Sequence, residues 1–218
     1  MSRYCRNAVV IMIVSVVSAC GGHRPSRTHP TDPFVTTQVA PLPLGSLSGS
    51  NVLLLVAGGI LLGDSAAPLP ELDAHRPALL DMANAALDTA LRRDGRDVNW
   101  MGLAEQRQAA RRSPTLGLDP DRFATAYLFD PKVDRVPDPL WGQVRSLAAI
   151  TGARFAVVPS AVKITGAQGA LTASFIMVVA DARTGSVMFR ARATGRPMAT
   201  AEAALASAAA TVIASPLH

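Results

Sequence analysis

The sequence predicts an α/β domain over residues 51–215, in which a mixed β-sheet of about five strands is covered by packed helices. Three observations lead to this fold class. Short apolar runs alternate with longer segments of helical periodicity, and the last third of the chain changes to two strand-like runs joined by a turn. The chain has 218 residues, 49% of them hydrophobic and 17% charged, which is enough to bury one core but hardly two.

The domain is expected to begin with a buried strand and a long helix. Residues 52–56 form a continuous apolar run that stops at Gly58 and Gly59, and residues 60–62 extend this strand past a bulge. Asp73 is expected to cap a helix over residues 73–93, since helical spacing follows it. The apolar stripe of this helix consists of Leu80, Ala83, Leu87, Ala90 and Leu91.

The middle of the domain predicts two further helices and two short strands. A strand over 97–100 precedes a helix over 102–112, which ends at a serine and a proline. Residues 116–137 read as a packed surface excursion with about one helical turn. Asp138 and Pro139 have the pattern of a cap and first-turn proline, so we expect a helix from there to Gly152. Its inward face consists of Leu140, Val144, Leu147 and Ala148, and a third buried strand follows over 155–158.

The last third of the chain predicts a hairpin and a terminal helix. Two strand-like runs, 171–180 and 186–194, are joined by a turn in which Gly185 can adopt the positive φ of a hairpin bulge. Thr200 is a suitable cap for an alanine-rich helix that continues to residue 214.

The amino terminus predicts export and lipidation. Residues 1–19 have a basic start, an apolar run too short to span a bilayer and a small-residue exit, as in a signal peptide. The sequence Val17-Ser18-Ala19-Cys20 resembles the bacterial lipobox, whose cysteine is lipidated and becomes the first residue of the mature protein. An ordinary signal peptide with a chance cysteine after the cut is the alternative. Acyl chains on Cys20 would hold the mature protein on a membrane.

Residues 20–50 are expected to link this anchor to the domain. They contain five prolines among Gly, Ser and Thr and show no apolar periodicity, which is typical of a flexible linker. Gly21 follows the cysteine where enterobacterial lipoproteins retained in the inner membrane carry aspartate, so the resemblance favours the outer membrane. We therefore expect the domain to face the periplasm.

The order of these elements resembles a known group of periplasmic domains. The segment 151–158 before a strand, and a hairpin turning on Asp181, Thr184, Gly185 and Val187, are similar to the α/β domain shared by curli-assembly-type lipoproteins, penicillin-binding-protein activator lipoproteins and the TolB amino-terminal domain. The arrangement of a lipobox and a proline-containing tether ahead of such a domain is similar to that of the activator lipoproteins in particular. The resemblance implies a non-catalytic adaptor. Two features depart from it: the chain has no amphipathic hairpin pair long enough for a secretion pore, and the 116–137 excursion has no counterpart.

The residue counts and spacings leave little room for catalysis or metal binding. Two cysteines and four histidines exclude a disulfide framework and a Cys/His zinc cluster. His75 with Ser65 and Asp64 is a weak candidate for a nucleophilic triad, because a histidine in a first helical turn is usually solvated. The aspartates of residues 119–138 lack the spacing of a calcium loop, and Gly58 and Gly59 lack that of a phosphate loop. We expect no enzyme activity, no cofactor and no metal.

One cluster of basic residues is denser than the rest of the chain. Six arginines fall within 21 residues: Arg92, Arg93, Arg96, Arg107, Arg111 and Arg112. Guanidinium groups bind carboxylates and phosphates through two parallel hydrogen bonds, so this predicted arginine cluster is a candidate docking face, with Trp100 as an interface anchor. The alternatives are a solvated helix face for the arginines and core packing for Trp100.

These features lead to two functional hypotheses. In the first, the protein is a membrane-anchored adaptor or regulator that binds a periplasmic protein partner. In the second, the same arginines bind an anionic cell-wall glycan or a lipid headgroup. The formal net charge of +5 is too small to indicate a nucleic-acid partner.

Overall fold

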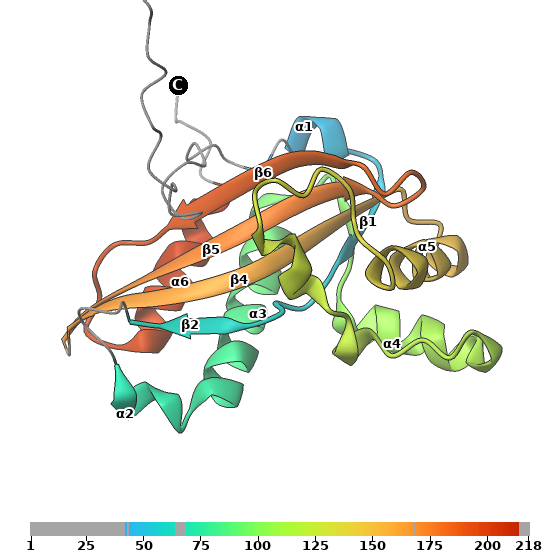
Figure 1. Ribbon diagram of the computed structural model, residues 1–218. Helices are drawn as coiled ribbons and strands as arrows, with labels where there is room; N and C mark the ends of the chain where they lie inside the picture. Colours follow the sequence, from blue (N-terminus) through green and yellow to red (C-terminus); the bar gives the residue numbers. More distant parts are fainter. Residues whose placement is uncertain (1–41, 43, 64–68, 168, 214–218) are drawn as a thin grey trace, which may run out of the picture. The chain divides into compact units, whose positions relative to one another are not determined.

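The computed structural model describes residues 42, 44–63, 69–167 and 169–213, which all belong to one compact unit, Thr31–His218. These residues form a mixed six-stranded sheet with helices on both faces (Figure 1), which confirms the predicted fold class. The strands are β1 (Asn51–Leu54), β2 (Ile60–Leu62), β3 (Asn99–Met101), β4 (Phe155–Ala167), β5 (Ala170–Asp181) and β6 (Val187–Thr194). The helices are α1 (Leu44–Leu47), α2 (Pro70–Asp73), α3 (Arg76–Asp94), α4 (Leu103–Arg112), α5 (Leu140–Thr151) and α6 (Ala201–Thr211).

The sheet combines a parallel half with an antiparallel half. Its order is β3-β1-β4-β5-β6, with β1 parallel to both of its neighbours and β4, β5 and β6 antiparallel. β1 pairs with the first part of β4 and β2 pairs with its second half. β1 and β2 therefore follow one another along the same edge of β4. This confirms the expectation that residues 60–62 continue the first strand beyond an interruption.

Helices cover both faces of the sheet because its central strands are apolar on both sides. Val52 and Leu54 of β1 pack in one core with α3 and α6, whereas Leu53 and Leu55 pack in a second core with α5. Figure 1 shows α3 and α6 behind the sheet in that view. The face of α5 that lies in the core is the predicted one.

The fourth strand is much longer than the sequence pattern indicates. The expected strand over 155–158 stops before Pro159, since proline cannot donate a hydrogen bond to a ladder. In the structure β4 continues to Ala167, and its pairing with β5 shifts register between Pro159 and Ala161. This bulge accommodates the proline, and the strand resumes beyond it.

The packed region also begins earlier than predicted. Leu42 and Leu47 are 4% and 1% exposed and belong to the core with α3 and α6, although the expected linker extends to residue 50. The Leu42 amide also donates to the Val212 carbonyl at 3.0 Å. Glycine, serine and proline between the leucines hide this apolar contribution in the composition. The predicted signal peptide, Cys20 and residues 21–41 lie outside the described residues.

Smaller differences concern helix starts and the 116–137 excursion. Asp73 ends α2 and does not cap α3, and α5 begins at Leu140 without a side-chain cap from Asp138. Leu79 rather than Leu80 of α3 lies in the core. A short 3-10 helix, η1 (Pro114–Leu116), leads into the excursion, which contains two more, η2 (Pro120–Arg122) and η3 (Thr125–Phe129). The predicted hairpin is confirmed, with Gly185 at φ +75°, and so is the Thr200 cap of α6.

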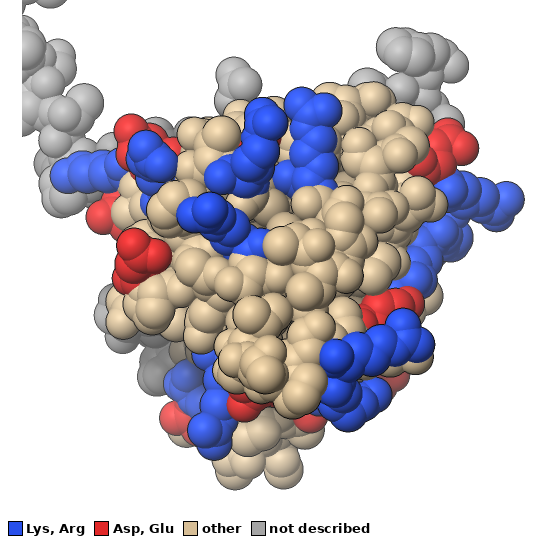
Figure 2. Space-filling model, turned by 90° about the vertical axis from the view of Figure 1, so that its right-hand side faces the viewer, with Lys and Arg blue, Asp and Glu red and all other residues tan. Residues whose placement is uncertain are grey.

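Charged side chains are unevenly distributed on the end of the domain that carries α4, α5 and the β5–β6 turn. Figure 2 views this end and shows basic side chains standing together on its upper part, whereas basic and acidic side chains touch in its lower part. Among the described helices, none combines the length and apolar character needed to cross a bilayer.

Candidate functional site

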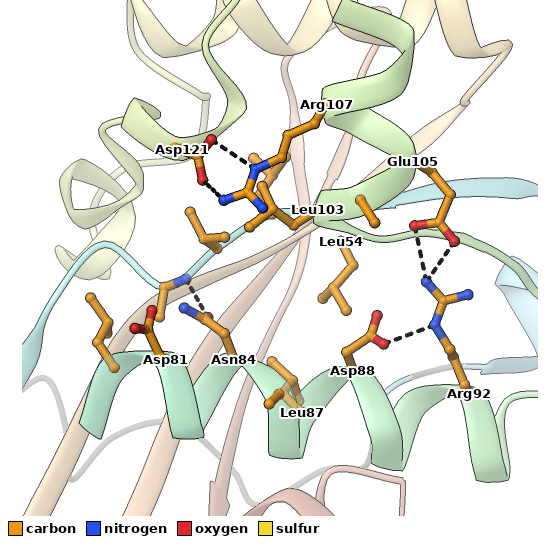
Figure 3. A pocket seen from close by; sticks show the side chains of 16 residues that line it. Leu54, Asp81, Asn84, Leu87, Asp88, Arg92, Leu103, Glu105, Arg107 and Asp121 are labelled. Carbon is orange, nitrogen blue, oxygen red and sulfur yellow. Dashed lines mark hydrogen bonds and ion pairs between the residues drawn. The ribbon is translucent and has the colours of Figure 1, made fainter. Parts of the chain in front are cut away.

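A groove of about 520 Å³ opens at the carboxyl end of β1, between α3 and α4 (Figure 3). The chain leaves β1 through α3 to β3 on one side, and it returns through α4 and α5 to β4 on the other side. β1 therefore lies where the sheet order reverses. In open α/β sheets, ligands bind beyond the carboxyl ends of the strands at this kind of position. We call this feature the α3–α4 groove.

The α3 wall of the groove is a polar stripe along that helix. Asp81, Asn84, Asp88 and Arg92 are spaced by three or four residues, so they share one face of α3. Figure 3 shows the first three of these side chains rising from α3 toward α4. Five leucines supply most of the apolar lining: Leu54, Leu55, Leu80, Leu87 and Leu103. The groove thus combines apolar patches with fixed polar groups, as binding sites commonly do.

Asn84 ties the α3 wall to the chain that follows β1. Its Oδ1 accepts a hydrogen bond of 2.8 Å from the Ala57 amide, which has no strand partner to bind. This contact gives the Ala57 amide, which lies at the interruption between β1 and β2, a hydrogen-bond acceptor. Asp81, in contrast, forms no hydrogen bond or ion pair with any described residue and is exposed at the mouth of the groove.

Arg92 bridges the two helices that form the groove. Its Nε donates to Asp88 at 2.9 Å, and its Nη2 donates to both carboxylate oxygens of Glu105 at 3.1 and 3.3 Å. The hydrogen bond to Asp88 raises the pKa of Arg92 above its ordinary value. Gly102 allows this arrangement, because a Cβ there would lie 2.7 Å from Arg92 and from Asp88.

Arg107 forms a second charged pair across the opening. Its Nε donates to Oδ2 of Asp121 at 2.9 Å, and its Nη2 donates to the other oxygen of the same carboxylate. This hydrogen bonding from Arg107 lowers the pKa of Asp121 below its usual range. Because Asp121 lies in η2, the pair joins α4 to the 116–137 excursion.

Gln106 fixes the strand ends next to the groove, and the sequence analysis missed it. The side chain is fully buried, and its Nε2 donates to the carbonyls of Leu54 and Met101, both at 2.7 Å. Gln106 therefore holds the ends of β1 and β3 together through α4. Its Oε1 has no hydrogen-bond partner among the described residues. A glutamine between charged residues of an amphipathic helix carries no local signal of burial.

The structure separates the predicted arginine cluster into several environments. Arg92 and Arg107 line the groove, whereas Arg93 pairs with Asp94 and Arg96 donates to the Arg93 carbonyl at 3.1 Å. Arg111 and Arg112 are exposed at the end of α4, and neither forms a hydrogen bond or ion pair with the described residues. The six side chains do not form one continuous face.

Trp100 is a core residue and is not exposed for a partner. It is 6% exposed, and its Nε1 donates to the Gly95 carbonyl at 2.9 Å. Gly95 allows this close contact, because a Cβ there would lie 3.0 Å from the Trp100 Nε1. The predicted role of Trp100 as an interface anchor is therefore corrected to packing beneath α3.

Most charged groups of the groove are paired with one another. Three of its four carboxylates already accept hydrogen bonds from guanidinium groups, and Asp81 is the fourth. Within the described part of the chain, no group of three or more His, Cys, Asp or Glu side chains is arranged to hold a metal ion.

Comparisons with known proteins give likeness of fold alone. No family model matches the chain, and no curated protein matches it. The chain is similar to the LpoB C-terminal domain from Salmonella enterica (13% identity, 73% of this chain and 87% of that chain, TM-score 0.40). It is also similar to lipoprotein GNA1162 from Neisseria meningitidis (14% identity, 67% and 80%, TM-score 0.34) and to a PelC dodecamer subunit from Paraburkholderia phytofirmans (11% identity, 82% and 94%, TM-score 0.32).

Proposed function

We propose that this protein is a lipid-anchored envelope lipoprotein that acts as a non-catalytic adaptor or regulator by binding a periplasmic protein partner. The lipobox-like sequence ending at Cys20 supports the anchor, and the α3–α4 groove is the proposed binding site. The domain would face the periplasm, with the outer membrane favoured. The proposal needs neither a metal nor a cofactor.

The observation that carries the proposal is that carboxylates of this chain neutralise both arginines of the groove. Four carboxylates and two guanidinium groups line it, and both guanidinium groups are bound to carboxylates of this chain. An anionic polymer would have to displace Asp88, Glu105 or Asp121 before it could bind these arginines. A protein segment with apolar side chains and a hydrogen-bond donor for Asp81 meets no such obstacle.

The same pairing weakens the hypothesis of an anionic glycan or lipid headgroup bound by the predicted arginine cluster. Arg92, Arg93 and Arg107 are engaged by carboxylates of this chain. Arg111 and Arg112 remain exposed without ion pairs, and two neighbouring arginines on one helix end make a small anion site. We therefore favour the protein partner.

A bulky residue placed in the groove tests this function. Ala104 lines the groove and is exposed on α4, so Ala104→Trp would fill the groove without removing a hydrogen bond of its side chain. Ala210 on α6 is an exposed helical alanine that does not line it, and Ala210→Trp is the matched control. The tagged full-length protein is purified from detergent-solubilised membranes of cells that make it, after cross-linking. We expect a stoichiometric protein partner with the unsubstituted chain and the control, and its loss with Ala104→Trp.

Two results would contradict the proposal. One is an unchanged partner yield with Ala104→Trp at an unchanged thermal unfolding midpoint. The other is salt-sensitive retention on isolated cell wall with no protein partner. The anchor is tested separately by labelled palmitate, whose incorporation should be lost in Cys20→Ser.

A further inference from the structure

A second group of arginines lies at the opposite ends of the parallel strands from the α3–α4 groove. We call Arg135, Arg145, Arg154 and Arg183 the hairpin-end arginines. Asp181 pairs with Phe155 at the amino end of β4, so the β5–β6 turn lies at the amino-terminal edge of the parallel strands. All four side chains are exposed, and none forms an ion pair within the described residues.

An aromatic ring and a carbonyl group hold two of these arginines in place. The guanidinium carbons of Arg135 and Arg145 lie 5.9 and 5.7 Å from the centre of the Trp141 ring. Arg135 also donates to the Thr184 carbonyl at 2.8 Å. The ring packs directly on the β5–β6 turn, since a Cβ on Gly185 would lie 2.9 Å from it. These cations are therefore positioned without losing their charge to a carboxylate.

The other two arginines adjoin this pair through the backbone of the turn. The Arg154 guanidinium lies 5.0 Å from the centre of the Phe155 ring. The backbone carbonyl of Arg154 accepts a hydrogen bond from the Ala182 amide. Ala182 precedes Arg183 on the turn, so the backbone of Arg183 lies near that of Arg154. The nearby Asp181 carboxylate forms no ion pair with these arginines: its Oδ1 accepts hydrogen bonds from the amides of Arg183 and Thr184, both at 2.9 Å.

The surroundings of these arginines have the composition of a protein interface. Met188 follows the turn on β6 and is 54% exposed, and Trp141 is half-buried. Arginine, tryptophan and methionine are enriched at protein interfaces relative to other surfaces. Trp141 is packed against the turn and its Nε1 is buried, so the ring is not free to insert among lipid headgroups.

We infer that the end of the domain formed by α5 and the β5–β6 turn is a docking surface for an acidic protein partner, whose carboxylates bind the hairpin-end arginines. This inference rests on the proposed adaptor function and adds a second surface to it. Fixed guanidinium groups lose less conformational entropy on binding than flexible ones, which favours a partner with carboxylates at matching positions. An acidic protein surface provides them.

Tryptophan fluorescence can report binding at this surface, because the chain has two tryptophans and Trp100 is buried. Poly-L-glutamate is titrated into the full-length protein in a nonionic detergent. We expect a saturable change in emission that is lost in Trp141→Phe. The double substitution Arg135→Gln/Arg145→Gln should weaken binding by about tenfold or more. Arg154→Gln/Arg183→Gln, which leaves both cations on Trp141, should weaken it by a similar factor.

The matched control removes the same charge from another place. Arg111→Gln/Arg112→Gln takes two exposed, unpaired arginines from α4 and should change the affinity less than twofold. An equal loss of affinity in this control and in both hairpin-end variants would overturn the inference. So would a response to soluble short-chain phosphatidylglycerol in the absence of any response to poly-L-glutamate.

The captured partner separates this inference from the proposed function. In one outcome, Ala104→Trp releases the partner, whereas the hairpin-end variants bind poly-L-glutamate and acidic proteins as tightly as the unsubstituted chain does. The adaptor function then stands and the second surface is rejected. If no protein is captured by any variant, the proposed function fails first.

Discussion

The two arginine groups of this domain differ in what holds them. At the α3–α4 groove, Arg92 and Arg107 form ion pairs with carboxylates of neighbouring elements, so their charge is neutralised within the chain. At the β5–β6 turn, Arg135 and Arg145 are held by the Trp141 ring and, for Arg135, by a carbonyl group, so their charge remains. Both groups are positioned, but only the second is available to an anion. Local density of arginine in the sequence therefore does not indicate which guanidinium groups the fold leaves unpaired.

The two regions also depend on different structural supports. The groove depends on hydrogen bonds between side chains and strand ends, above all those of Gln106. The hairpin end depends on the contact between a ring and a glycine turn. Substitutions can remove each support separately, and the expected effects differ in size.

The largest expected effect is the loss of the Gln106 amide. Gln106→Leu would leave the buried carbonyls of Leu54 and Met101 without their donor, and we expect it to lower the free energy of unfolding by about 2–4 kcal/mol. Denaturation in urea measures this change. Gln108→Leu, on the exposed part of the same helix, should change the free energy by about 0.5 kcal/mol or less. Equal effects of the two substitutions would refute the role assigned to Gln106.

A smaller effect is expected at the turn that supports Trp141. Gly185→Ala introduces strain at φ +75° together with a clash against the ring, and it should cost about 2 kcal/mol. Gly117→Ala has similar strain at φ +58° with no atom within 4 Å of the new Cβ, so it should cost about 1 kcal/mol. Thermal unfolding compares the two. A cost at Gly185 no greater than at Gly117 would mean that the turn does not hold the ring.

The smallest effect concerns the exposed pair of Arg107 and Asp121. Because the pKa of Asp121 is lowered, the stabilisation by its carboxylate is fully present above its ordinary pKa and is lost as the pH falls through the lower folded value. Asp121→Asn should therefore be slightly less stable than the unsubstituted protein at neutral pH, and the two should converge in strong acid. Unfolding midpoints measured across acidic pH check this, and a difference that does not change with pH would contradict it.

Much of the fold could be predicted because local patterns determine it. The buried face of α5 and the Gly185 turn follow from apolar spacing and from the conformational freedom of glycine. The full length of β4 could not be predicted, because only pairing with β5 shows that a bulge absorbs Pro159. Leu42 and Leu47 were likewise hidden by the composition around them.

The candidate sites were harder to predict because they depend on contacts between distant elements. Arg107 is paired by Asp121, which lies on a 3-10 helix of the excursion, and no local pattern links the two. The hairpin-end arginines are scattered over almost fifty residues, so they form no cluster in the sequence. Trp100 was selected for its position beside dense arginines, whereas Trp141 is the tryptophan that contacts arginines at the surface.

Site-specific photo-cross-linking in living cells tests the adaptor function most directly. A photoreactive amino acid replaces Ala104 in the groove, Thr184 in the β5–β6 turn, or Ala210 on α6 as the control. We predict discrete protein adducts from Ala104 and from Thr184, and none from Ala210. Absence of protein adducts at both Ala104 and Thr184, with the protein correctly anchored and folded, would contradict the proposal that this domain acts by binding other proteins.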